Sequence, residues 1–197
     1  METVRSLWNR LENWGRTNAP KMLEDLNSGA GDDEIIALES ALNLTLPASY
    51  KESLRIHNGE SDGWPCKIFA DRGAYLSTEG VLKEWNMRRE FGEGSELEGT
   101  QEELVRDGII EVSGPVQAKM FLPAWIPFLE SNGDVFWAID FSPAEGGASG
   151  QIIEVHWESC SWRVVADSFQ ALLDEYVSAL ERGDYTIQNG RPTLSPY

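Results

Sequence analysis

Two histidines are the residues in this sequence that could act as bases or metal ligands near neutral pH. His57 and His156 lie far apart, and each ends an apolar stretch. Catalysis or zinc binding needs several such groups to converge. The chain also contains no G-x-S-x-G motif, which would place a nucleophilic serine on a strained elbow. The favoured interpretation is that both histidines are structural residues at the boundary of the core.

Two further features could carry chemistry around residues 134–150. The run Gly146-Gly147-Ala-Ser-Gly150 has the glycines of a phosphate loop. It lacks the Gly-Lys-Ser/Thr ending and joins two strand patterns, so we predict a flexible hairpin loop. Asp134, Asp140 and Glu145 form an acidic set nearby, and two carboxylates about 5–10 Å apart could hydrolyse a glycoside. A turn-stabilising role is more typical of a residue such as Asp134. We therefore predict no catalytic residue, no metal and no cofactor.

Tryptophan is abundant, with eight residues in the chain. A tryptophan can fill a core or anchor a binding surface. Trp137 lies on an alternating strand pattern, which favours the core. Trp64 lies in an irregular Gly-Trp-Pro segment, where both interpretations remain open. Trp85 falls on a predicted helix and is kept as a candidate partner contact.

The elements that must position these residues centre on residues 123–153. Trp125–Leu129 is a short apolar run, and Asn132-Gly133 suits a two-residue type I′ turn because both central residues need φ > 0. Val135–Asp140 alternates between two faces, and Gly150–Val155 offers a third strand. The sequence therefore predicts an antiparallel meander, with a further strand at 161–166 and an edge strand at 116–121.

Helical patterns flank this meander on both sides. Apolar spacing predicts a first helix from Val4 that Gly15 ends, followed by a short helix from Pro20 to Leu26. Further helices are expected: one capped by Asp32 or Asp33, one over 47–56, one with Ser77 as its N-cap that runs to about Phe91, and a short piece near 102–106. Ser168 caps a final helix that ends at Gly183.

This order of elements predicts an α+β fold. We expect a mostly antiparallel sheet of about four to six strands, flanked by N-terminal helices and one C-terminal helix. Residues 1–22 are interpreted as an N-terminal helical extension and 23–185 as a single domain with an acidic insertion at 92–111. Residues 186–197 are expected to form a loosely held tail.

The net charge of −17 excludes two classes of partner. Nucleic acid and anionic lipid both require a cationic surface. The acidity is explained either by solubility or by a basic protein partner. Cys66 and Cys160 stand alone, as is typical of a reducing compartment. No apolar segment of signal-peptide or membrane-helix type is found, so a cytoplasmic location is expected.

The chain also resembles a known family through an ordered set of short segments. They are Leu46-Pro47 with Tyr50, Ile56–Gly59, Leu76-Ser77 with Glu84-Trp85, Trp125–Phe128, Asn132–Asp134, Asp140–Pro143, Gly146-Gly147 with Gly150–Ile152, and Ala166–Phe169. Together these are similar to the SUKH superfamily, in the branch of the fungal Smi/Knr cell-wall-assembly regulators. The resemblance implies an α+β fold without enzymatic activity. It also implies action through protein contacts, either as an immunity protein that neutralises a toxin or as a regulator.

The leading hypothesis from the sequence is an immunity-type protein that binds a basic, nuclease-like toxin. The alternative is a regulatory scaffold of the fungal type, and a hydrolase using the hairpin carboxylates comes third. The oligomeric state is left open. The candidate partner contacts are Asp62, Trp64, Trp85, Glu96, Glu98, Glu102, Glu103, Asp134 and Glu145.

Overall fold

The computed structural model describes residues 2–61, 68–94 and 100–194 of the 197-residue chain. Its α-helices are α1 (Val4–Asn18), α2 (Asp32–Leu42), α3 (Ala48–Ile56), α4 (Thr78–Gly94), α5 (Gln101–Arg106) and α6 (Phe169–Arg182), with 3₁₀ turns η1 (Pro20–Leu23) and η2 (Ala70–Arg72). Its strands are β1 (Ala74–Tyr75), β2 (Glu111–Ser113), β3 (Trp125–Ser131), β4 (Val135–Asp140), β5 (Gln151–His156), β6 (Ser161–Ala166), β7 (Tyr185–Gln188) and β8 (Arg191–Leu194).

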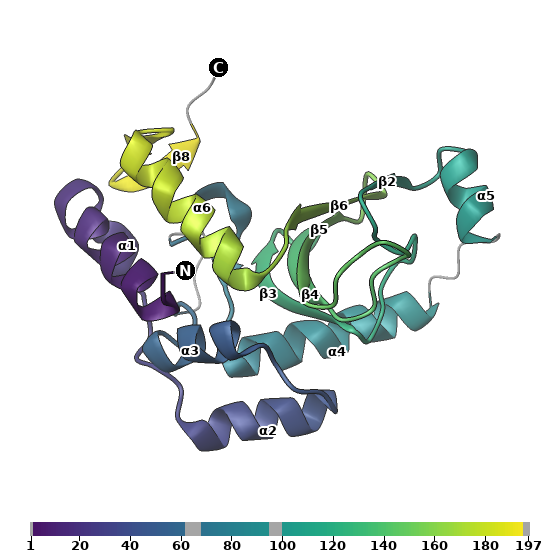
Figure 1. The fold of residues 1–197 in the computed structure, drawn as a ribbon, viewed down its shortest axis with the longest axis horizontal. Coiled ribbons are helices and arrows are strands. Elements are labelled where there is room, and N and C mark those ends of the chain that lie inside the picture. The colour runs from purple at the N-terminus through teal and green to yellow at the C-terminus, as the bar shows by residue number, and fades with distance from the viewer. Residues whose placement is uncertain (1, 62–67, 95–99, 195–197) are drawn as a thin grey trace.

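The strands form one large sheet and one hairpin. The six-stranded sheet has the order β1-β3-β4-β5-β6-β2, and every pair is antiparallel except β2 with β6. The hairpin pairs β7 with β8. Figure 1 shows the helices around this strongly curved sheet, with α5 standing beyond its β2 edge. The predicted α+β class with a mostly antiparallel sheet is confirmed.

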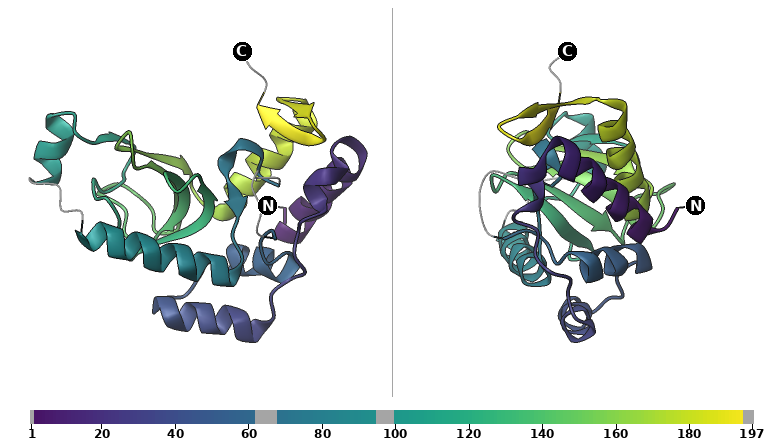
Figure 2. Two further views of the ribbon diagram at one scale, coloured as in Figure 1. Left: turned by 180° about the vertical axis from the view of Figure 1, so that it is seen from behind. Right: turned by 90° about the vertical axis from the view of Figure 1, so that its left-hand side faces the viewer.

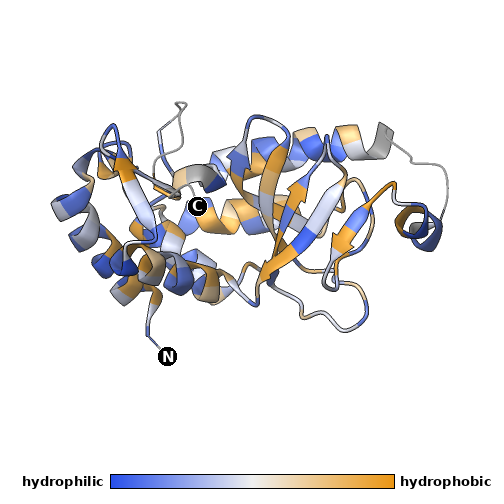
Figure 3. Ribbon diagram, turned by 90° about the horizontal axis from the view of Figure 1, so that it is seen from above, coloured by the Kyte–Doolittle hydropathy of each residue, from blue (hydrophilic) through white to orange (hydrophobic). Residues whose placement is uncertain are grey.

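The two faces of the sheet are covered by different elements. Phe136 of β4 faces α4, and the Arg88 guanidinium lies 4.0 Å from the centre of its ring. Trp137, the next residue, faces η2, where the Arg72 guanidinium lies 5.2 Å from its ring. Figure 2 shows α6 and α1 side by side at the end of the molecule opposite α5. Figure 3 shows orange apolar residues alternating with polar ones along the strands, and orange bands on the helices around them. Trp137 is buried, which confirms its predicted place in the core.

The turn between β3 and β4 is one residue longer than predicted. Asn132 and Gly133 both have positive φ, 62° and 75°, as the sequence indicated. The paired residues are Ser131 and Val135, so Asp134 also belongs to the loop. Its carboxylate accepts from the Glu158 N–H (2.5 Å) and its carbonyl from the Trp157 N–H (3.2 Å). These bonds to the neighbouring turn hold Asp134 out of the ladder.

Predicted helix caps are confirmed at Ser77 and Ser168, but the cap predicted at Asp32 or Asp33 is wrong, because α2 begins at Asp32 and its N-cap is Gly31. The Ser77 hydroxyl accepts from the Gly80 N–H at the start of α4, and the Ser168 hydroxyl accepts from the Ala171 N–H at the start of α6. Gly183 ends α6 with φ of 82°. The two serine hydroxyls accept from backbone N–H groups that have no partner within the helix. Gly183 adopts the left-handed conformation that ends a helix.

The predicted ends of two N-terminal elements are wrong. Helix α1 continues past Gly15 to Asn18, and a Cβ at Gly15 would lie 3.2 Å from the Leu23 side chain. Gly15 therefore allows Leu23 of η1 to pack closely against α1. The second element is a 3₁₀ turn that ends at Leu23 instead of a helix that reaches Leu26.

Two further expectations are also wrong. Residues 116–121 form no strand but cross a face of the sheet, and Phe121 packs its ring edge-on against Trp125. The alternating pattern there reflects contact with the core, without a ladder. Residues 189–194 do not form a loose tail, because Asn189 and Gly190 make the tight turn between β7 and β8.

Candidate protein-interaction surface

Asn58 and Gly59, two residues of the family resemblance, join three parts of the backbone. The Asn58 Oδ1 accepts from the Thr78 N–H (2.8 Å), and its own N–H donates to the Ser28 carbonyl (3.1 Å). Gly59 has φ of 73°, and a Cβ there would lie 2.2 Å from the Ser77 nitrogen. The segment therefore fixes the start of α4 against the end of α3.

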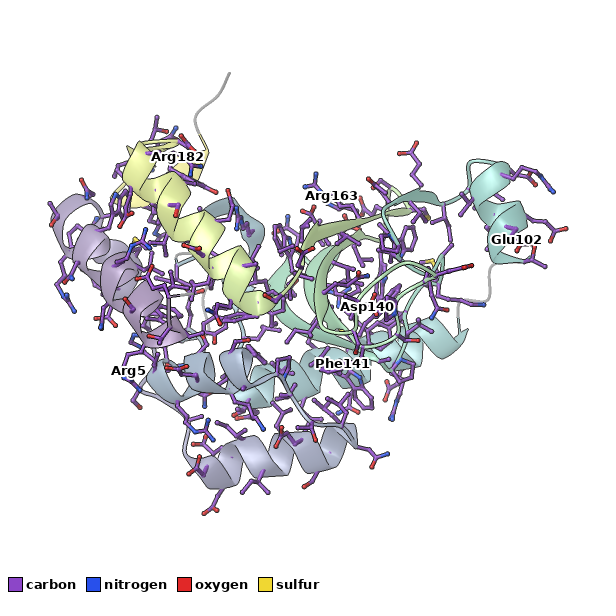
Figure 4. All side chains as sticks on the ribbon, in the orientation of Figure 1. Arg5, Glu102, Asp140, Phe141, Arg163 and Arg182 are labelled. Atoms are coloured by element: carbon purple, nitrogen blue, oxygen red, sulfur yellow. The ribbon has the colours of Figure 1, made fainter. Side chains whose placement is uncertain are left out.

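Asp140 and Gln151 form a second structural junction, at the end of β4 (Figure 4). The Asp140 carboxylate accepts from the Ser142 N–H (2.8 Å) and the Gln151 Nε2 (2.9 Å). Gln151 also donates to the Pro115 carbonyl (2.9 Å). Burial raises the pKa of Asp140, while these hydrogen bonds oppose the shift. The carboxylate ties the glycine-rich loop to the chain after β2.

Arg88 anchors α4 beneath the β3–β4 turn. Its side chain is fully buried, stacked 4.0 Å from the Phe136 ring centre and 4.5 Å from that of Trp157. It forms an ion pair with Glu84 one turn earlier. Burial lowers the pKa of Arg88 and raises that of Glu84. This pair is enclosed, so it offers no binding surface.

The candidate chemical groups do not converge within the described residues. His57 contacts the Asn27 carbonyl and the Glu12 carboxylate, each at 3.0 Å, whereas His156 lies on β5 beside Glu154. Asp134 precedes β4 and Asp140 ends it, so the two carboxylates occupy opposite ends of one strand. No group of three or more His, Cys, Asp or Glu side chains in the described ranges is placed to hold a metal ion. The geometry favours the structural interpretation of these residues.

Exposed apolar side chains lie near the end of α4 and on and just after α5. Phe91 is 60% exposed, and Val105 and Ile109 are 42% and 47% exposed. Phe91 packs edge-on against Trp157, and with Met120 these rings line a small hollow of about 70 Å³. Figure 1 places α5, β2 and the end of α4 at the same end of the molecule. We call this region the α5 end.

A larger hollow of about 530 Å³ opens between α5 and β2. Its lining is mostly apolar and consists of Glu102, Val105, Arg106, Val112, Val116 and Ala118. Leu104 and Ile110 are buried and hold α5 in place, and the Thr100 hydroxyl caps the helix at the Glu103 N–H (3.2 Å). The hollow is therefore bounded by anchored elements.

Acidic side chains surround the apolar residues of the α5 end. The exposed acids are Glu90, Glu102, Glu103, Asp107, Glu111 and Glu158. Arg106 is exposed too, but its guanidinium donates to Asp107 at 2.8 Å. Two further exposed cations lie nearby: Lys119 in the segment after β2, and Arg163 of β6, which pairs with Ser113 and forms an ion pair with Glu154. Apolar groups ringed by like charges are typical of a surface that binds an oppositely charged protein.

The predicted contact residues fall into four groups. Glu102 and Glu103 lie exposed at the α5 end, and Figure 4 shows Glu102 on the outer side of α5. Trp85 is only 6% exposed, and its indole N–H donates to the Pro123 carbonyl, so it offers no accessible anchor. Asp134 lies at the start of β4, and Glu145 lies in the loop beyond the strand's other end. Asp62, Trp64, Glu96 and Glu98 lie outside the described residues.

The predicted contacts do not include the apolar members of this surface. Phe91, Val105 and Ile109 are exposed, whereas all of the predicted contacts are tryptophans and acids. Val105 and the pair Ile109-Ile110 stand within an acidic stretch that is otherwise polar. That pattern could have indicated an apolar patch with an acidic rim.

Comparison with known proteins finds similarity to several fungal regulators. It is 26% identical to the glucan synthesis regulatory protein of Neurospora crassa, over 93% of the chain and 40% of that protein. It is 27% identical to the cell wall biosynthesis/cell cycle regulator smi1 of Schizosaccharomyces pombe, over 97% of the chain and 39% of that protein. The cell wall assembly regulator SMI1 of Saccharomyces cerevisiae is 23% identical, over 91% and 41%. The chain thus spans about two fifths of the length of these relatives.

The family match agrees with the segments that carry the resemblance. Residues 29–175 match the SMI1 / KNR4 family (SUKH-1), which includes both structural junctions, at Asn58 and at Asp140. None of the helices in the described residues has the length and apolarity needed to cross a membrane. With most of its length inside this match, the chain belongs to the SMI1/KNR4 (SUKH-1) family.

Proposed function

We propose that this chain is a protein-binding regulatory module that acts in the control of glucan or cell-wall synthesis. The names of the fungal relatives support this role. The observation that carries the proposal is the α5 end, where exposed apolar side chains stand within an acidic rim. Such a surface binds proteins without any catalytic residue.

The relatives favour regulation over the immunity role that leads in the sequence analysis. The toxin hypothesis depends on the net charge of −17, because a basic nuclease would be attracted to an acidic partner. The same charge suits any basic partner. The matched proteins are named as regulators, so regulation becomes the leading function and the basic partner is retained.

A chimera tests this function in a living cell. In Saccharomyces cerevisiae, the matched part of the cell wall assembly regulator SMI1 would be replaced by this chain. The chimera would then be expressed in a strain lacking that regulator, and growth under cell-wall stress would be measured. We expect the chimera to restore growth, because the module would supply the missing protein contacts.

Two matched substitutions locate the activity on the surface. Phe91→Ser removes an apolar side chain that is 60% exposed at the α5 end. Ile36→Ser removes an apolar side chain that is 58% exposed on α2. We expect only Phe91→Ser to impair growth. A chimera that accumulates normally and restores no growth contradicts the regulatory role. Equal growth of the two variants would instead contradict the assignment to the α5 end.

A further inference from the structure

We propose that the hollow between α5 and β2 binds an extended basic segment of a partner protein, with one apolar side chain of that segment inside the hollow. This inference rests on the proposed function and names the class of partner. Its three supports are the apolar lining of the hollow, the charge of its rim and the free edge of β2.

The lining of the hollow suits an apolar anchor. Val105 on α5, Val112 on β2 and the Val116–Ala118 segment contribute side chains to it from three directions. Val105 is 42% exposed, so its side chain gains further burial when a ligand enters. The hollow is wide open to solvent, so the backbone that adjoins the anchor can lie along its mouth.

The rim of the hollow selects for positive charge. Glu102 lines it, and Glu103 and Glu111 are exposed on the two elements that border it. Arg106 also lines the hollow, but Asp107 neutralises its guanidinium through hydrogen bonds of 2.8 and 3.1 Å. Hydrogen bonds from Thr100 lower the pKa of Glu103, so this carboxylate, like the other exposed acids of the rim, carries its charge at neutral pH. A segment rich in lysine or arginine complements this rim.

The edge of β2 explains why the segment should be extended. In the parallel register with β6, Glu111 pairs with Ser161 and its N–H donates to the Cys160 carbonyl (2.8 Å). The peptide groups of a strand alternate in direction, so the N–H and C=O of Val112 face away from β6. No other strand within the described ranges pairs with this edge. An extended peptide can form main-chain hydrogen bonds there while its apolar anchor side chain enters the hollow.

The strand is short, so side chains must supply most of the affinity. β2 has three residues, and only Val112 presents both main-chain groups outward. The apolar anchor is therefore expected to dominate specificity, and the charges to accelerate and strengthen association.

Fluorescence anisotropy with synthetic peptides tests this mode directly. The probe is a fluorescein-labelled nonapeptide with leucine at its centre and lysine or arginine at all of the remaining positions. A second peptide carries serine at the centre, and a third replaces the basic residues by glutamine. We expect the leucine peptide to bind at least about tenfold more tightly than either control, because burial of a leucine side chain is worth about one to two decades of affinity.

A matched pair of protein variants separates the hollow from the general negative field. Val105→Lys and Ile187→Lys change the net charge equally and replace side chains of nearly equal exposure, 42% and 41%. Only Val105 lines the hollow. We expect Val105→Lys to weaken binding of the leucine peptide at least about tenfold and Ile187→Lys to change it less than about twofold. Circular dichroism would verify that both variants fold.

Several outcomes overturn the inference. Equal binding of the leucine and serine peptides removes the apolar anchor, and equal effects of the two lysine variants remove the hollow. Binding of the glutamine peptide at the affinity of the basic one removes the charge complementarity. None of these results bears on growth of the chimera, so a failure of this binding mode is distinguishable from a failure of the regulatory function.

Discussion

Asp140 shows how a residue of a recognisable motif can serve structure alone. Its carboxylate is buried at the end of β4 and receives hydrogen bonds from Ser142 and Gln151. The hydrogen bonds favour the charged form, yet desolvation is larger and raises the pKa of Asp140 above its ordinary value of 3.8. Protonation of Asp140 is therefore coupled to the folding equilibrium.

The sign of this shift predicts a pH dependence of stability. The folded protein holds the Asp140 proton more tightly than the unfolded chain does, so the contribution is fully present below about pH 3.8 and is lost as pH rises through the raised pKa. Asp140→Asn cannot titrate. We expect the free energy of unfolding of the original protein, relative to this variant, to fall between pH 4 and pH 8. Urea unfolding at several pH values measures it, with Asp33→Asn on the surface of α2 as control. A relative stability that rises with pH would show that the hydrogen bonds outweigh burial.

The Glu84–Arg88 pair predicts a second effect at the residue scale. Arg88 is fully buried, and Glu84 neutralises its charge from one helical turn away. Glu84→Leu leaves a buried charge without its partner, which costs about 3–5 kcal/mol. We expect the double variant Glu84→Leu/Arg88→Met to recover most of this loss, because apolar side chains suit the space between Phe136 and Trp157. Urea unfolding of both variants checks this. A double variant no more stable than Glu84→Leu would mean that stacking of the guanidinium on the two rings is the larger contribution.

At the scale of elements, Gly59 fixes the distance between the end of α3 and the start of α4. It has φ of 73°, and a Cβ would lie 2.2 Å from the Ser77 nitrogen. Gly133, in the β3–β4 loop, has a similar φ of 75° but nothing within 4 Å of its Cβ position. The two glycines thus share a backbone conformation and differ in steric surroundings.

This contrast predicts unequal costs for the same substitution. Gly133→Ala should lose about 1 kcal/mol of stability, because alanine tolerates positive φ poorly. Gly59→Ala carries that cost and also forces two backbones apart, so we expect a loss of about 3 kcal/mol or more in total. Thermal and urea unfolding of the two variants provide the measurement. Similar losses would show that the α3–α4 junction yields easily.

Local signals predict an element well when the element depends on its own residues. Ser168 and Gly183 satisfy the two ends of α6, so the helix is readable from the sequence alone. Residues 116–121 alternate like a strand, but no ladder forms because the segment crosses a sheet face. Asn189-Gly190 is a local hairpin signal too, and both residues adopt the positive φ that the turn between β7 and β8 requires.

The interaction surface was harder to predict than the fold. Glu102 and Glu103 were singled out by charge, and both lie at the α5 end. Val105 and Val112 meet only because β2 pairs in parallel with β6 and carries α5 with it, a tertiary arrangement that no local pattern encodes. Trp85 illustrates the converse, because its amphipathic helix buries the side chain that composition made attractive.

At the scale of the whole molecule, ion pairs neutralise only part of the acidic charge. Arg10 of α1 donates to Glu181 of α6 at 3.0 Å, and Arg10 also forms an ion pair with Glu2 of the N-terminal segment. Such exposed pairs contribute about 0–1 kcal/mol each. The chain still carries 33 acids against 16 basic residues, so repulsion among unpaired carboxylates extends over the surface.

Salt should therefore move stability and binding in opposite directions. Screening at 0.15 M salt acts beyond about 8 Å, so it relieves the many long-range repulsions more than it weakens the few close pairs. We expect the free energy of unfolding to rise between 0.01 and 0.3 M NaCl. The triple variant Glu145→Lys/Glu158→Lys/Asp167→Lys changes the net charge from −17 to −11, since each substitution adds two units, and should respond less to salt. Over the same range the affinity for a basic peptide should fall, because the attraction that draws it in is screened too. Urea unfolding and anisotropy in matched buffers measure both. If stability fell with salt along with affinity, close ion pairs such as Arg10–Glu181 would outweigh the net charge, and the acidity would have to be understood as a set of local contacts.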